Sequence, residues 1–92
     1  MSVVVKIPTQ LRDLVGGKSE IEVADVATIR EMFEKLGADH PALVERIIDE
    51  SGELRRFVNV YVGDEDVRFL EGLETAAEGP VTILPAVAGG GC

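Results

Sequence analysis

Short apolar runs alternate with polar turns along the chain, and the first two runs have the spacing of strands. Residues 3–7, "VVVKI", are rich in β-branched side chains, and residues 19–23, "SEIEV", alternate polar with apolar positions. Both patterns predict strands. Gly16 and Gly17 lie between them and permit the positive φ angles of a tight turn, so we expect an antiparallel hairpin with its apolar positions toward the core.

The next segment, "TIREMFEKLG", has the periodicity of an amphipathic helix. Its apolar positions follow the spacing i, i+3, i+4, i+7 and are Ile29, Met32, Phe33 and Leu36. Thr28 and Glu31 have the spacing of a capping box, which satisfies open backbone N–H groups at a helix start. Gly37 follows the last apolar position, where we expect the helix to stop.

A second, shorter helix is predicted from Pro41 to about residue 48, followed by a polar loop around Ser51 and Gly52. Residues 56–62, "RFVNVYV", have the strongest strand character in the chain, and the "GDED" that follows is typical of a turn. The alternation places Val58, Val60 and Val62 inward. It places Phe57, Asn59 and Tyr61 outward.

The remaining elements are a short strand at residues 67–69 and a last strand at residues 81–85, with Thr82 and Leu84 outward. The order is strand, strand, helix, short helix, strand, short strand, strand. This order indicates an α+β fold in which a mixed sheet packs on one main helix. The expected division is a domain over residues 1–85 and a flexible glycine-rich tail over residues 86–92.

The length, charge and apolar runs of the chain exclude several classes of partner. The chain has 92 residues, enough for one domain, and a net charge of −8 without a long basic run, so we expect no nucleic acid partner. No apolar run approaches the roughly 20 residues that span a bilayer, so no membrane association is expected. The beginning of the chain lacks the pattern of a signal peptide, which favours a cytoplasmic protein.

Catalytic and metal-binding residue patterns are scarce. His40 is the single histidine and has no nucleophile beside it in the sequence. One histidine and one cysteine do not supply the ligands of a zinc site, and "GDED" lacks the distal glutamate of a calcium loop. We therefore expect no catalytic residue, no metal and no bound cofactor.

The segment after the last strand is the most informative feature. It is "AVAGGGC", in which three glycines contribute no side chain to a core. Extended, these seven residues reach roughly 24 Å. Since glycine passes where a Cβ would clash, this segment is suited to enter a narrow channel and present a terminal carboxylate to another protein.

Two stretches, "RFVNVYVGDEDVRF" and "VTILPAVAGG", resemble the ubiquitin-like sulfur carriers of the ThiS/MoaD family, and most closely its actinobacterial cysteine-synthesis branch. The resemblance covers nearly the whole chain and implies a β-grasp fold and a protein that is not itself an enzyme. It also implies an adenylating, E1-like activating enzyme that uses ATP on the terminal glycine, and sulfur then converts the adenylate to a thiocarboxylate. In the cysteine branch a PLP-dependent synthase accepts the sulfur, and a metallopeptidase releases the product.

By position, the family's diglycine corresponds to Gly89 and Gly90, and this chain departs from the pattern because Gly91 and Cys92 follow. Cys92 has three interpretations: an extension that a peptidase trims, a carrier–cysteine adduct, or an addition for labelling. We favour the trimmed extension. The reactive glycine is then Gly90, or Gly91 as the alternative.

We further expect the outward residues Phe57, Tyr61 and Leu84 to form an apolar patch that docks the activating enzyme or synthase. Four rival functions stay open at this point. Within the same fold the chain could be the small subunit of a molybdopterin synthase or a carrier for another sulfur-containing product. Outside that class it could be a ubiquitin-like protein modifier or a structural binding domain.

Overall fold

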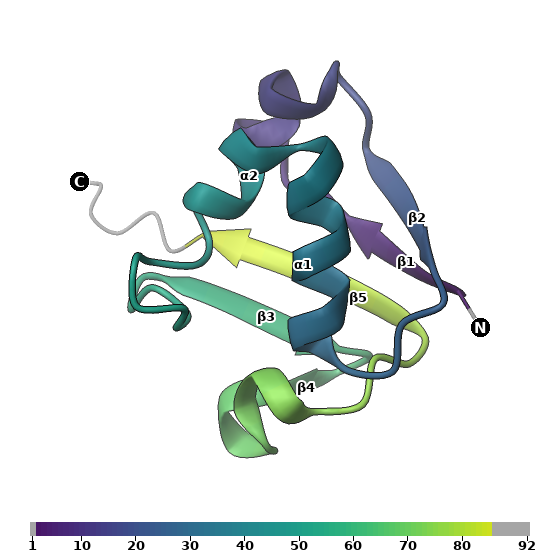
Figure 1. The fold of residues 1–92 in the computed structure, drawn as a ribbon, viewed down its shortest axis with the longest axis vertical. Coiled ribbons are helices and arrows are strands. Elements are labelled where there is room, and N and C mark those ends of the chain that lie inside the picture. Colours follow the sequence, from purple (N-terminus) through teal and green to yellow (C-terminus); the bar gives the residue numbers. More distant parts are fainter. Residues whose placement is uncertain (1, 86–92) are drawn as a thin grey trace.

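The computed structural model describes residues 2–85 and gives a mixed sheet with its helices on one side (Figure 1). The strands are β1 (Ser2–Lys6), β2 (Glu20–Ala24), β3 (Val58–Val62), β4 (Glu65–Asp66) and β5 (Pro80–Pro85). The α-helices are α1 (Ile29–Asp39) and α2 (Pro41–Glu45). Three 3₁₀ helices complete the chain: η1 (Thr9–Val15), η2 (Val67–Phe69) and η3 (Gly72–Glu74).

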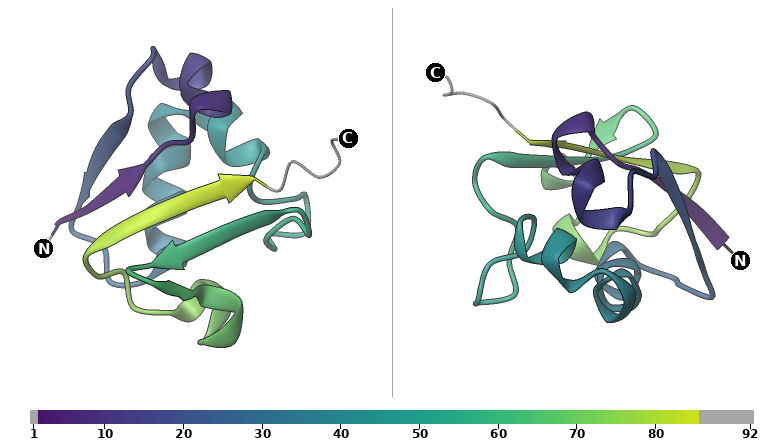
Figure 2. Two further views of the ribbon diagram at one scale, coloured as in Figure 1. Left: turned by 180° about the vertical axis from the view of Figure 1, so that it is seen from behind. Right: turned by 90° about the horizontal axis from the view of Figure 1, so that it is seen from above.

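The five strands lie in the order β2-β1-β5-β3-β4. Strands β1 and β5 occupy the centre and run parallel, while every other neighbouring pair is antiparallel. Helix α1 crosses one face of the sheet, and no helix of residues 2–85 covers the opposite face (Figure 2). This is the β-grasp architecture, and it confirms the predicted α+β fold class.

The core fills the space between α1 and the covered face of the sheet. Its strand residues occupy every second position, because successive side chains of a strand point to opposite faces. The fully or almost fully buried residues include Val3, Val5, Val23, Ile29, Met32, Phe33, Leu36, Val58, Val60, Val81 and Ile83. The predicted inward residues Ile21 and Val62 are only partly buried and pack against this core.

The start of α1 confirms the capping prediction with a one-residue shift. The Thr28 hydroxyl accepts a hydrogen bond from the Glu31 N–H at 3.2 Å. The Glu31 carboxylate accepts one from the N–H of Ala27 at 2.8 Å, not from Thr28 itself. Both ends of the motif therefore satisfy backbone donors at the helix entrance. No helix within residues 2–85 is long and apolar enough to cross a membrane.

The predicted tight hairpin between β1 and β2 is wrong in its connection. The two strands are antiparallel neighbours, but η1 lies between them and buries Leu11 and Val15. Gly16 and Gly17 have φ angles of 70° and 83°. These glycines therefore end η1 and turn the chain toward β2, because a left-handed conformation after a helix is accessible to glycine without strain.

The predicted end of the main helix at Gly37 is also wrong. Helix α1 continues through Gly37 to Asp39, and His40 lies between α1 and α2. The stop comes from Pro41, since a residue before proline is disfavoured in the helical conformation. Helix α2 ends at Glu45, before the expected residue 48. The chain turns after Glu45, and Ile48 then forms an isolated β-bridge with Leu54 instead of continuing the helix.

The predicted short strand at residues 67–69 is wrong as well. The "GDED" segment contains strand β4, which pairs with the end of β3, and η2 replaces the expected strand. The Asp66 carboxylate accepts a hydrogen bond from the Arg68 N–H at 2.8 Å. This cap turns the chain into a 3₁₀ helix, although the apolar alternation of Val67 and Phe69 is compatible with a strand.

Candidate docking site at the end of strand β5

Strand β5 leads directly to the glycine-rich segment of the sequence. Pro85, its last residue and the last described one, pairs with Val58 of β3. The predicted functional residues Gly89, Gly90, Gly91 and Cys92 lie outside the described residues. The structural question is therefore what surrounds the point where the chain leaves the sheet.

The base of this exit is firmly held. Strand β5 lies between β1 and β3, with ladders on both sides, and Val81 and Ile83 are fully buried beneath it. A central strand with both edges paired has little freedom to shift register, because a slip would move its buried side chains to the open face. The exit is thus a fixed point on the molecule.

Leu84 and Phe57 are exposed apolar side chains beside this exit. Their exposed fractions are 46% and 55%. Leu84 pairs across the ladder with Asn59, so Phe57 and Tyr61 occupy its two diagonal positions along the neighbouring chain. Tyr61 is partly buried. The structure therefore brings the three predicted residues into one neighbourhood, with Leu84 and Phe57 the more accessible.

Arg68 is part of this neighbourhood, and its contribution was not foreseen from the sequence. Its guanidinium donates to the Asn59 side-chain oxygen at 2.9 Å and to the Arg55 carbonyl at 2.6 Å. These bonds tie η2 to the segment that enters β3. Since Asn59 is the ladder partner of Leu84, Arg68 helps to fix the polar border of the apolar pair. The only sequence signal is the "DVR" pattern, in which Asp66 caps the turn.

A second pair of exposed apolar residues lies in and after η2, on the side of the sheet bordered by β4. Phe69 is 84% exposed and Leu70 is 43% exposed. The sequence analysis placed Phe69 in a strand and assigned neither residue to a surface. Figure 1 shows that η2 lies beside β4, the strand at the edge of the sheet. These two residues serve as a comparison surface for the Leu84 neighbourhood.

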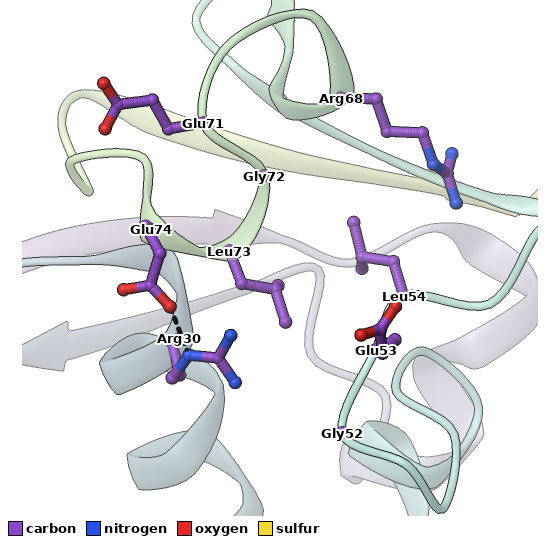
Figure 3. Close-up of a pocket in the computed structure, with 9 residues that line it drawn as sticks. All are labelled: Arg30, Gly52, Glu53, Leu54, Arg68, Glu71, Gly72, Leu73 and Glu74. Atoms are coloured by element: carbon purple, nitrogen blue, oxygen red, sulfur yellow. Dashed lines mark hydrogen bonds and ion pairs between the residues drawn. The ribbon is translucent and has the colours of Figure 1, made fainter.

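A hollow of about 270 Å³ lies on the helical side, between the start of α1, the loop at Gly52 and Leu54, and the η2–η3 segment (Figure 3). Arg30 and Glu74 form an ion pair of 2.6 Å at its border, with both side chains about half exposed. Leu54 and Leu73 project into it. The lining offers no serine, cysteine or histidine to act as a nucleophile or base.

Metal chemistry has no structural basis in the part of the chain that the structure describes. No three histidine, cysteine, aspartate or glutamate side chains converge there as a metal-ligand group. His40 is partly buried; its N–H donates to the Leu36 carbonyl of α1 at 2.8 Å, and its carbonyl accepts a hydrogen bond from the Leu43 N–H of α2 at 3.1 Å. Its observed contacts are those of a helix junction.

The mixed sheet folded on α1 defines a ubiquitin-like β-grasp protein, and its central strand β5 ends beside exposed apolar side chains. The chain belongs to the ThiS family, whose match covers residues 5–90. The match thus contains all five strands except the first residues of β1, and it extends past the described fold to Gly90.

Individual relatives agree with the family. The chain is 51% identical over 94 residues to "Sulfur carrier protein CysO" of Mycobacterium tuberculosis, with 98% of this chain and 100% of the relative covered. It is 38% identical over 82 residues to "Small archaeal modifier protein 3" of Haloferax volcanii, covering 86% and 88%.

A solved structure of an Amycolatopsis orientalis BexX/CysO complex contains a similar chain. The TM-score is 0.84 and the sequence identity is 44%, with 92% of this chain and 96% of that chain covered. That relative is therefore recorded together with a second protein, BexX.

Proposed function

We propose that this protein is a sulfur carrier whose glycine carboxylate is adenylated and then converted to a thiocarboxylate. The observation that carries the proposal is the family match, which spans residues 5–90 and includes both the fold and the diglycine. The names of the curated relatives support the same role. Gly90, the last matched residue, is then the reactive terminus.

The chemistry needs a partner enzyme because a carboxylate is a poor electrophile. Attack of a carboxylate oxygen on the α-phosphorus of ATP releases pyrophosphate and forms an acyl adenylate. Sulfide then attacks the acyl carbon. The bond between this carbon and the phosphate oxygen breaks, AMP leaves with that oxygen, and the product is a thiocarboxylate. ATP belongs to the activating enzyme, and the carrier supplies only the acyl group and the surface that docks it.

The geometry at the end of β5 supports a carrier that presents its acyl group to a separate activating enzyme. Five residues separate Pro85 from the end of Gly90, so an extended segment places the carboxylate up to about 17 Å from the end of the sheet. A fixed base and a slim segment of this length suit delivery into an active site recessed within another protein. Leu84 and Phe57, exposed beside the base, would contact the rim of that site.

For the later steps we propose the route of the cysteine branch. A PLP-dependent synthase takes sulfur from the thiocarboxylate onto an activated serine derivative, and rearrangement leaves cysteine in amide linkage to the last glycine. A metallopeptidase then hydrolyses that amide. The support is the similarity to CysO, together with the record of a CysO relative in complex with another protein.

Protein modification is the second candidate, because one relative is named a small archaeal modifier protein. A modifier joins the same activated glycine to lysine amines, whereas a carrier releases it unchanged after sulfur transfer. An affinity-tagged chain ending at Gly90, expressed in its source organism and analysed under denaturing conditions, should be recovered at its free mass. A ladder of tagged adducts with glycine–lysine isopeptide bonds would instead support modification.

A further inference from the structure

Three arginines come from the two segments that flank the end of β5, although the protein as a whole is acidic. Arg55 and Arg56 lie three and two residues before the start of β3 at Val58, and the Val58 N–H donates to the Arg55 carbonyl at 3.1 Å. Val58 in turn pairs with Pro85. These two arginines therefore lie within one turn of the residue at which the chain leaves the sheet.

Arg12 approaches the same end of β5 from the other side. Its Nε donates to the Ile7 carbonyl at 3.0 Å, just after β1. Because β1 and β5 run parallel with Lys6 opposite Thr82, Ile7 lies level with Ile83 near the end of β5. Figure 2 shows β5 ending between the β1 side of the sheet and the segment that leads into β3.

Arg12 and Arg55 are oriented by backbone contacts and not by carboxylates. Besides the Arg12 bond, the Nε of Arg55 donates to the Glu45 carbonyl at 2.9 Å. Within residues 2–85 the ion pair between Arg30 and Glu74 is the sole one. A guanidinium carries five N–H donors, so the outer nitrogens of Arg12 and Arg55 keep their capacity for a bidentate partner.

Acidic side chains lie near these arginines without neutralising them through direct pairs. Glu45, Asp49 and Glu50 border a shallow hollow together with Arg55. The Asp49 carboxylate already accepts hydrogen bonds from the N–H groups of Ser51 and Glu53, at 2.8 and 3.1 Å. Arg56 is exposed, and its side chain makes no hydrogen bond to a described residue.

We infer that Arg12, Arg55 and Arg56, here called the exit arginines, dock carboxylates that border the site into which the partner protein receives the segment after Pro85. The inference rests on the proposed function and names the chemistry of the partner's rim. A carboxylate rim matches a guanidinium bidentately and adjoins the apolar contact of Leu84 and Phe57. A polyanion such as nucleic acid is disfavoured, because the net charge of −8 repels it.

The test measures binding to BexX of Amycolatopsis orientalis, the protein in complex with the 44% identical relative. The variant R12Q/R56Q removes two positive charges at the exit. The control K18Q/K35Q removes two elsewhere: Lys18 follows η1, and Lys35 lies on α1 with its ammonium donating to the Ala24 carbonyl at 2.9 Å. We expect R12Q/R56Q to weaken binding about tenfold and to reduce its salt dependence, with a much smaller effect of the control.

Equal weakening by the two variants would overturn the inference, because only total charge would then matter. Absence of any BexX binding by the unaltered chain would overturn it as well. Should R12Q/R56Q fail to fold, R56Q alone carries the test, since that exposed side chain supports no described contact. Sulfur incorporation by the unaltered chain is measured separately, so these failures are distinguishable from failure of the proposed function.

Discussion

A chain that retains Cys92 should be inert toward adenylation, and removal of Gly91 and Cys92 should activate it. The reason is covalent: the printed sequence continues past Gly90, so that glycine's carbonyl is in a peptide bond and has no carboxylate oxygen to attack ATP. The family match ends at the same residue. Pyrophosphate release by the activating enzyme, measured with chains ending at Cys92, Gly91 and Gly90, should be fastest for Gly90 and at background for Cys92.

The chain ending at Gly91 is the matched control for this comparison, because it has a free glycine carboxylate at a shifted position. Slower turnover of that chain would indicate that the enzyme measures the distance from the sheet. Adenylation of the intact Cys92 chain at the rate of the Gly90 chain, with mass spectrometry showing no proteolysis, would contradict the trimming hypothesis. The reactive group would then be the carboxylate of Cys92 itself.

Substitutions at Ile83 and Leu84 should affect different properties, stability in the first case and partner binding in the second, because the two side chains face opposite sides of the sheet. Ile83 is fully buried, so Ile83→Ala should lower the free energy of unfolding by about 2–5 kcal/mol, measured by urea denaturation. Leu84 is 46% exposed. Leu84→Asp should therefore leave unfolding nearly unchanged and weaken binding to the activating enzyme, measured by calorimetry.

Phe69→Asp is the control for the Leu84 variant, since it places the same charge on an exposed apolar position of η2, outside strand β5 and its ladder partner. It should bind the activating enzyme as the unaltered chain does. Equal binding by Leu84→Asp would remove Leu84 from the docking surface. A large loss of stability in Leu84→Asp would show that the side chain supports the fold, contrary to its exposure.

The sequence predicted the features of the fold that depend on local periodicity. The stripe from Ile29 to Leu36 and the alternation in residues 58–62 are repeated signals, and they form α1 and β3, although β3 begins at Val58 and not at the expected Arg56. The errors at Gly37 and at residues 67–69 share a cause: a single residue or a three-residue pattern is compatible with two structures. In each case a neighbour decides, through Pro41 in the first and the Asp66 cap in the second.

The candidate site was predictable in part for the same reason. Outward positions follow from the alternation along residues 57–61 and 82–84, so Phe57, Tyr61 and Leu84 could be named together, although Phe57 lies one residue before β3. The partial burial of Tyr61 and the reach of Arg68 to Asn59 depend on how η2 folds back beside β3. Those contacts join residues nine positions apart through a turn that no periodic pattern describes. The predicted division into a domain over residues 1–85 and a flexible tail over residues 86–92 stays a prediction.

The most direct measurement of the central claim is the intact mass of a chain ending at Gly90 after incubation with the activating enzyme, ATP and sulfide. If the protein is a sulfur carrier, the mass increases by the exchange of one oxygen for one sulfur, and only when ATP is present. Alkylation should then modify the new thiocarboxylate, since the shortened chain contains no cysteine. An unchanged mass, despite ATP-dependent release of pyrophosphate, would contradict the sulfur-carrier account.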